Sequence, residues 1–125
     1  MIVGTGIDIA EVPRIAQALA RHGERFLHRV FTEGEIRYCD SKANRVERYA
    51  ARFAAKEAAM KALGTGHSQG VLWRDIEVVR RGGPPQLQLH GGAARRFAAM
   101  NGRSSLVTIT HSETLAFAQV LLFND

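Results

Sequence analysis

The sequence has one cysteine, few aromatic residues and no long apolar run. A single cysteine excludes an internal disulfide and a zinc site built from several cysteines. No apolar run approaches the ~20 residues that cross a bilayer. The first eight residues lack a basic segment followed by a long apolar one, so we expect no signal peptide, no membrane association and a cytoplasmic location.

The composition is that of a folded domain. Hydrophobic residues make up 46% and charged residues 23% of the 125 residues, which are globular proportions. A chain of this length buries roughly two-thirds of its unfolded surface, enough to fold without crosslinks. We therefore expect a single domain over residues 1–125.

Negative charge is scarce relative to positive charge. Lys and Arg number 17 against 12 Asp and Glu, a formal net charge of +5. Such a balance indicates an acidic partner, for example nucleic acid, a phosphorylated ligand or an acidic protein. A general preference for arginine, which supplies 14 of the 17 cations, is the alternative explanation.

Hydrophobic periodicity and turn residues predict mixed helices and strands. A long apolar helix near the middle of the chain is the strongest element. The expected strands cover 1–10, 71–81, 86–90, 105–111 and 115–123, the last two as a hairpin, and the expected helices cover 13–22, 43–63 and 93–100, with a broken helical stretch over 24–40.

The last predicted strand, 115–123, is apolar on both faces. A sheet in so small a protein usually leaves one face in water. We therefore expect a second cover for this strand, either another subunit or a helix.

Asp8 lies on a strand face that carries almost no side chains. Alternation places Gly4, Gly6, Asp8 and Ala10 on one face of the first strand. A glycine-rich face lets a ligand or another backbone approach closely. Asp8 is therefore either a functional carboxylate or a cap for the following helix.

Glu57 falls within the apolar arc of the long helix over 43–63. A carboxylate there is costly unless it is paired, protonated or bound to a metal. Lys61 follows one turn later, in the favourable order for a simple salt bridge. A metal-binding role and a salt bridge both remain open for Glu57.

A row of cations borders the same arc, at Arg45, Arg48, Arg52 and Lys56. Most such rows are solvated faces, but beside Glu57 this one could bind a polyphosphate. The segment 61–66 adds a lysine and a glycine-rich turn, although it lacks the GxxxxGK[ST] order of a P-loop.

Three further residues could bind a ligand or a partner. His111 ends a predicted strand just before a turn, where a histidine can be structural or functional. Arg14 and Arg21 share one face of the first helix, two turns apart. They could dock an acidic partner or simply form a solvated face.

Taken together, two carboxylates, several cations and a histidine indicate a phosphate-bearing ligand. An Asp and Glu pair with few other ligands suits Mg²⁺, which keeps waters and takes phosphate oxygens. The competing interpretations are a nucleic-acid-binding module, a metal-dependent phosphohydrolase and a non-catalytic trimeric scaffold. A nucleic-acid-binding module would need aromatic residues between its surface cations, and aromatic residues make up only 7% of the chain. A phosphohydrolase normally has more carboxylate or histidine ligands than we can place.

Three segments carry a resemblance to a known family. Residues 6–12 (GIDIAEV), 52–66 (RFAAKEAAMKALGTG) and 108–112 (TITHS) resemble the holo-[acyl-carrier-protein] synthases, the small bacterial 4′-phosphopantetheinyl transferases. Phe31 and Thr32 with Glu35, and residues 73–78, are also similar to this family. Thr110 stands where the family usually has serine, so the hydroxyl is retained.

The resemblance implies a fold and a reaction. The fold would be α+β, a small antiparallel sheet packed against one long helix, in a homotrimer with active sites between subunits. The reaction would transfer the 4′-phosphopantetheine group from coenzyme A to a serine of apo-acyl carrier protein. It would release adenosine 3′,5′-bisphosphate, require Mg²⁺ and serve fatty acid synthesis.

The resemblance also implies residue roles. As a separate hypothesis on mechanism, we expect Glu57 to take the serine proton, directly or through a metal-bound water, with a water positioned by Asp8 as the second candidate. By this resemblance Asp8 and Glu57 would bind the metal, and Lys61 would contact the pyrophosphate. His111 and Gly64 would contact coenzyme A, and Arg45 or Arg52 would bind its 3′-phosphate. Arg14 and Arg21 would contact the acidic helix of the carrier protein.

Overall fold

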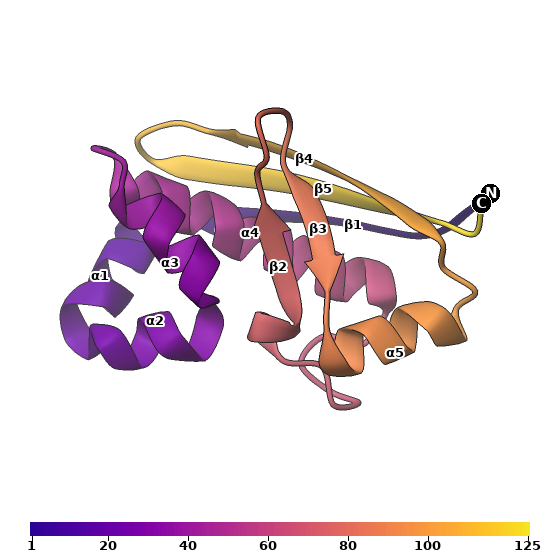
Figure 1. Cartoon of the computed structure of the whole chain (residues 1–125). Coiled ribbons are helices and arrows are strands. Elements are labelled where there is room, and N and C mark those ends of the chain that lie inside the picture. Colours follow the sequence, from indigo (N-terminus) through magenta and orange to yellow (C-terminus); the bar gives the residue numbers. More distant parts are fainter.

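A computed structural model describes residues 1–125, and five helices and five strands make up the domain (Figure 1). Four of the strands were expected almost to the residue. In chain order the elements are β1 (Ile2–Glu11), α1 (Val12–His22), α2 (Glu24–Val30), α3 (Glu33–Asp40), α4 (Arg45–Leu63), the 3-10 turn η1 (Trp73–Asp75), β2 (Ile76–Val79), β3 (Gln86–Leu89), α5 (Gly91–Ala99), β4 (Ser104–His111) and β5 (Leu115–Phe123).

The strands form two antiparallel sheets. The larger has the order β1-β5-β4, so that β5 is central and β1 and β4 are its edges. Ala118 of β5 pairs with Asp8 on one side and with Ile109 on the other. The smaller sheet pairs β2 with β3. The α+β class and the predicted hairpin are confirmed, whereas the expectation of one sheet was incomplete.

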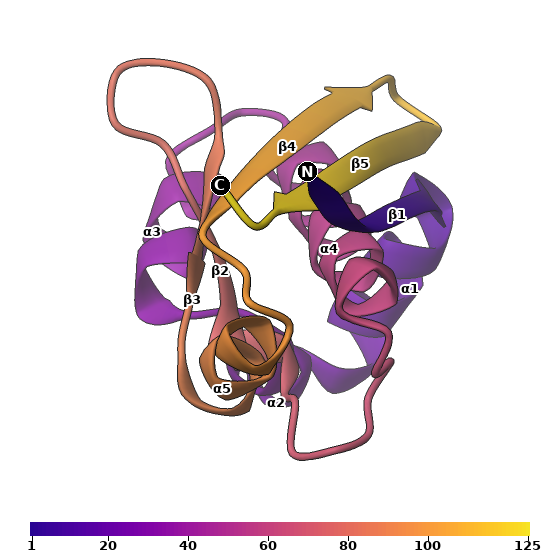
Figure 2. The same ribbon diagram turned by 90° about the vertical axis from the view of Figure 1, so that its right-hand side faces the viewer.

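The long helix α4 packs on the inner face of the larger sheet (Figure 2). Glycine makes the close approach possible, because a Cβ at Gly6 would overlap the Ala58 carbonyl oxygen, and one at Gly4 would overlap that of Ala62. The bare face predicted for β1 therefore accommodates the backbone of α4. Four side chains of β5 line the rest of this interface, all buried: Ala116, Ala118, Val120 and Leu122.

The outer face of the larger sheet has no cover within the chain. Ile7 and Ile9 of β1, Phe117 of β5 and Leu106 of β4 are exposed large hydrophobic side chains. The register places Ile9 opposite Phe117 on this face. Because α4 covers only the inner face, the alternative of a second covering helix for β5 is wrong.

The strand expected over 71–81 is shorter than predicted. The Asp75 carboxylate accepts a hydrogen bond from the Leu72 backbone N–H, at 3.0 Å, and this closes the turn η1 before β2 begins. The broken stretch over 24–40 resolves into α2 and α3. A capping box of Thr32 and Glu35 starts α3.

Cys39 is fully buried in the core beside α4. Burial raises the pKa of its thiol to about 12, so this thiol is protonated and unreactive at neutral pH. None of the helices combines the length and the apolar character of a membrane span.

Candidate active site

Asp8 and Lys61 form an ion pair at the β1 edge of the sheet. The Lys61 ammonium lies 3.0 Å from Asp8 Oδ1 and donates to the Ile7 carbonyl oxygen, also at 3.0 Å. These three residues and Ile9 line a shallow depression, which we call the β1 hollow. Asp8 does not cap α1, because Glu11 occupies that N-cap position.

Glu57 is held by donors outside its own helix. Its Oε1 accepts a hydrogen bond from the Trp73 indole Nε1 at 3.2 Å and lies 3.3 Å from His67 Nε2. Lys61 pairs with Asp8 instead, so the predicted Glu57–Lys61 salt bridge is wrong. The Glu57 side chain remains 23% exposed, so its position at the border of the apolar arc leaves it open to a ligand.

The row of cations on α4 is not one solvated face. Lys56 is fully buried, and Arg52 is buried as well. The alternative of a solvated face is therefore wrong for Arg52 and Lys56, and Lys56 is also out of reach of a polyphosphate. The reason is tertiary, since α3 and β2 pack over this part of the helix.

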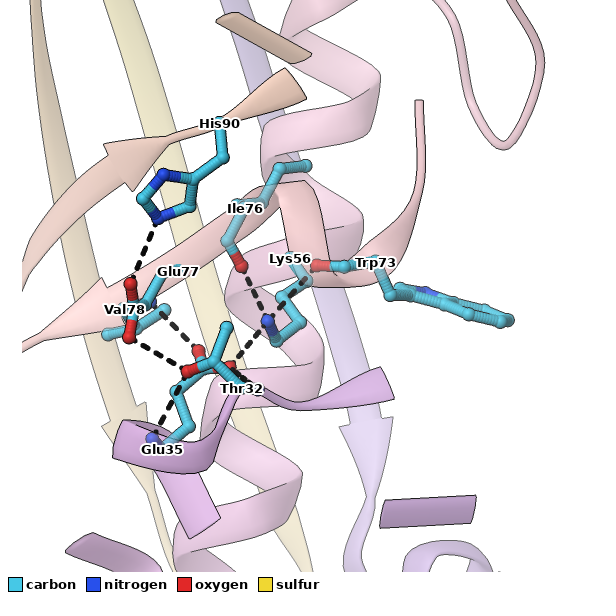
Figure 3. Close-up of polar contacts among 8 residues, drawn as sticks. All are labelled: Thr32, Glu35, Lys56, Trp73, Ile76, Glu77, Val78 and His90. Carbon is cyan, nitrogen blue, oxygen red and sulfur yellow. Dashed lines mark hydrogen bonds and ion pairs between the residues drawn. The ribbon is translucent and has the colours of Figure 1, made fainter. Parts of the chain in front are cut away.

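Lys56 belongs to a buried polar cluster (Figure 3). Its ammonium lies 2.7 Å from Glu35 Oε1 and donates to the carbonyl oxygens of Trp73 and Ile76. Glu35 also accepts from the Val78 backbone N–H at 2.8 Å. Burial lowers the pKa of Lys56, although Glu35 opposes that effect.

Arg52 and Arg45 occupy different environments. The Arg52 guanidinium lies 4.0 Å from the centre of the Tyr38 ring, and its Nε is buried with no hydrogen-bond partner. Arg45 instead pairs with Asp40 at 3.0 Å on the surface. Arg52 is therefore the cation with unused donor capacity.

A second hollow of about 360 Å³ lies on the β4 side of α4, and we call it the β4 hollow. Cations and a turn of two prolines dominate its wall. Its lining residues are Arg48, Ala51, Arg52, Arg80, Pro84, Pro85, Val107, Thr108, Ile109 and His111. His111 is part-buried there, with Nδ1 2.6 Å from Glu47 Oε1.

The predicted site residues thus divide between two places. Asp8 and Lys61 line the β1 hollow, and Arg52 and His111 line the β4 hollow. No residue lines both hollows, and β1 and β4 are opposite edges of the sheet (Figure 2). Within one chain the predicted residues do not meet in one site.

The remaining predicted residues lie elsewhere. Gly64 ends α4 with φ of 75°, a left-handed conformation that glycine adopts readily. Arg14 and Arg21 are exposed on α1, and the nearest carboxylate to Arg14 is Glu11, at 3.4 Å. An exposed pair of that length contributes little, so Arg14 remains available to a partner.

Sequence reasoning missed four polar residues that the fold brings to these places. Trp73 and His67 reach Glu57, and Glu47 and Arg80 reach the His111 region. Trp73, His67 and Arg80 come from turns and loops, whereas Glu47 lies in the first turn of α4, and all four are distant in the chain from the residues that they reach. The one signal available was the pair of prolines after Arg80, which marks a turn beside a cation.

The donor set suits a weakly held divalent cation. No group of three or more His, Cys, Asp or Glu side chains is arranged to hold a metal ion. Lys61 lies one turn after Glu57 and contacts Asp8, which puts both carboxylates on the same side of α4. Two carboxylates with room for water and phosphate oxygens are the ligands that Mg²⁺ takes in such sites.

Comparison with known proteins identifies the family of the chain. Residues 4–115 match the family model of the 4′-phosphopantetheinyl transferase superfamily. The holo-[acyl-carrier-protein] synthase of Koribacter versatilis is 58% identical, over 98% of each chain. The crystal structure of the Neisseria meningitidis synthase superimposes with a TM-score of 0.90 at 28% identity, over 98% of this chain and 99% of that one.

A structure with a bound nucleotide also matches. The Bacillus anthracis holo-(acyl-carrier-protein) synthase, described as a complex with CoA (3′,5′-ADP), is 38% identical with a TM-score of 0.80, over 98% of this chain and 96% of that one. Family model, relatives and fold agree over nearly the full length. The chain therefore belongs to the holo-[acyl-carrier-protein] synthases, within the 4′-phosphopantetheinyl transferase superfamily.

Proposed function

We propose that this protein transfers the 4′-phosphopantetheine group of coenzyme A to a serine of apo-acyl carrier protein, with adenosine 3′,5′-bisphosphate as the second product. One observation carries the proposal. Asp8, Glu57 and Lys61 lie on one side of α4, in a chain that belongs to a family of phosphopantetheinyl transferases. The single cysteine agrees with our proposal of a cytoplasmic location.

Asp8 and Glu57 are the proposed ligands of Mg²⁺. When bound, Mg²⁺ offsets the charge that develops on the transferring and leaving phosphates. Glu57 Oε2 has no hydrogen bond within the chain, so this oxygen is available. Asp8 becomes fully available when Lys61 turns from it to the substrate.

Lys61 is the proposed contact to the pyrophosphate. Its ammonium is exposed, and a fixed positive charge stabilises negative charge that grows in the transition state. Glu57 is the proposed acceptor of the serine proton, directly or through an ordered water. Asp8 is the weaker candidate because Lys61 already occupies it.

The β4 hollow is the proposed site for the nucleotide end of coenzyme A. Arg52 has an unpartnered buried N–H, and Arg48 and Arg80 add charge to the same wall. Arg52 therefore binds the 3′-phosphate rather than Arg45, which lies outside this hollow. His111 would contact a second phosphate, with Glu47 orienting its ring. Gly64 is the proposed contact near the Lys61 end of the ligand.

The division of the site between two edges of the sheet supports assembly between subunits. A ligand with a pyrophosphate and a 3′-phosphate needs both hollows, and one chain offers them apart. The uncovered outer face of the sheet provides apolar surface for the contact. We propose a homotrimer, in which the β1 hollow of one copy meets the β4 hollow of the next in a closed ring.

The carrier protein is the proposed second substrate, and α1 its docking surface. Arg14 and Arg21 are exposed on this helix and offer positive charge to an acidic helix. We propose no role in binding nucleic acid or membranes.

Intact-mass spectrometry of apo-acyl carrier protein tests the function directly. Incubation with this protein, coenzyme A and Mg²⁺ should add the mass of one phosphopantetheine, and EDTA should prevent the gain. Glu57→Gln should keep some coenzyme A binding and lose most turnover. No mass gain with a folded protein that binds coenzyme A would contradict the proposal, as would hydrolysis of coenzyme A without any carrier protein.

A further inference from the structure

We propose that Trp73 is a positioning residue for Glu57: its indole N–H fixes one carboxylate oxygen, and buried Lys56 fixes Trp73, so that the other oxygen faces a divalent cation. The inference rests on the proposed function, in which Glu57 binds the metal. The inference assigns a positioning role to Trp73, a residue that takes no part in the proposed reaction itself.

The side-chain contact is selective for one oxygen. The indole Nε1 donates to Glu57 Oε1 at 3.2 Å, and His67 Nε2 lies 3.3 Å from the same atom. No group in the chain bonds to Oε2. Two partners on one oxygen fix the plane of the carboxylate, and this leaves Oε2 free to bind a cation. Partners of this kind commonly set the affinity of a ligand for its metal.

The main chain of Trp73 is held by the residue that precedes Glu57. The Lys56 ammonium donates to the Trp73 carbonyl oxygen at 3.1 Å and also to that of Ile76 (Figure 3). Consecutive residues of α4 therefore hold η1 twice, Lys56 through the backbone and Glu57 through the indole. Lys56 is kept in place by Glu35, at 2.7 Å, with both side chains fully buried.

Packing restricts the indole ring as well. The centroid of the Trp73 ring lies 4.2 Å from that of His67 and 6.1 Å from that of Phe53. The Arg29 guanidinium lies 5.8 Å from the centre of the Trp73 ring. Phenylalanine would satisfy these ring contacts. Only an indole also supplies the N–H, so the hydrogen bond to Glu57 can be removed without removing the ring.

Trp73→Phe is the variant that separates the two contributions. We expect its affinity for Mn²⁺, measured by electron paramagnetic resonance, to fall about tenfold, and the Mg²⁺ concentration for half-maximal transfer to rise by a similar factor. The KM for carrier protein should not change. Leu72→Ala is the matched control, because Leu72 is an exposed neighbour on the same turn whose side chain makes no hydrogen bond. Unchanged Mn²⁺ affinity in folded Trp73→Phe protein would overturn the proposal.

Trp73 is the one tryptophan of the chain, so the unmodified protein provides a second test. Mg²⁺ should change the intrinsic fluorescence with the same concentration dependence as activity, and Glu57→Gln should abolish the change. Constant emission while Mn²⁺ binds would overturn the proposal even if Trp73→Phe failed to fold. A wild-type protein that binds Mn²⁺ but transfers nothing would contradict the proposed function instead.

Discussion

Two lysines of α4, five residues apart, each pair with a carboxylate, yet they lie in opposite environments. Lys56 and Glu35 are 0% exposed and 2.7 Å apart, inside a cluster of hydrogen bonds. Lys61 is 56% exposed and 3.0 Å from Asp8, at the rim of the β1 hollow. The first pair ties α3 and β2 to the helix, and the second faces the solvent where a substrate can reach it.

The difference shows what burial does to the same pair of charges. A buried pair has lost its water, so either charge left alone is expensive, and the pair cannot open for a ligand. An exposed pair contributes about 0–1 kcal/mol, so a phosphate can replace the carboxylate at little cost. The lysine that we propose as the substrate contact is therefore the one whose ion pair contributes less to stability.

Lys61→Met should have the largest effect on activity. Removal of one charge that stabilises the transition state costs about 10²–10³ in turnover. The melting temperature should hardly change, because the lost ion pair is exposed. The mass-gain assay and thermal unfolding measure the two effects on one sample. A large loss of stability with normal turnover would reverse the roles assigned to the two lysines.

Lys56→Met should have the largest effect on stability. It leaves Glu35 buried without its partner, which costs about 3–5 kcal/mol. Urea unfolding measures the change in the free energy of unfolding. The double variant Lys56→Met/Glu35→Leu should recover part of the loss, since neither charge of the buried pair then remains. A single variant as stable as the wild type would show that the pair is dispensable.

The buried cluster should also shape the response to acid through Glu77. Burial alone would raise the pKa of Glu77, but hydrogen bonds from His90 and Thr32 outweigh it and hold this pKa below its ordinary value of 4.5. As the pH falls, Glu77 therefore takes up its proton at a lower pH in the folded state than in the unfolded state. The stability from Glu77 is fully present above pH 4.5 and is lost as the pH falls through the lower, folded-state pKa.

Glu77→Gln removes that contribution. Stability at neutral pH should fall modestly, and the decline below pH 4.5 should become shallower than in the wild type. Urea unfolding at a series of pH values measures both. Parallel curves for the two proteins across the acid range would exclude Glu77 as a source of acid sensitivity.

Arg14→Ala should have the smallest effect, because it touches neither ion pair. The KM for carrier protein should rise several-fold, since a cation at the edge of an interface mainly assists association. The affinity for coenzyme A should not change. An unaltered KM at low ionic strength would make Arg14 part of a solvated face.

Local pattern in the sequence predicted much of the fold. Patterns of neighbouring residues predicted three features: the strand β1 with its alternating glycines and Asp8, the helix α4 with its apolar stripe, and the β4–β5 hairpin. The interpretation of the row of cations on α4 failed because the sequence of a helix does not reveal which of its faces another element will cover. Arg52 and Lys56 share the spacing of Arg48, but α3 and β2 bury them.

The site could be predicted only as a set of residues, not as an arrangement. The sequence indicates Glu57 as a candidate, and with it the three residues that line the hollows, Asp8, Lys61 and His111. Their division between two hollows depends on sheet order, which places β1 and β4 at opposite edges. The Trp73–Glu57 bond depends on a turn, which no periodicity indicates.

The most direct test of a site shared between copies is a mixing experiment. Asp8→Asn disables the β1 hollow and His111→Ala the β4 hollow, so each variant alone should be nearly inactive in the mass-gain assay. After subunits exchange in a ring of three, one site in four combines two intact halves, so an equal mixture should regain about a quarter of wild-type turnover. If subunits demonstrably exchange and the mixture remains as inactive as its components, each site lies within one chain and the account is contradicted.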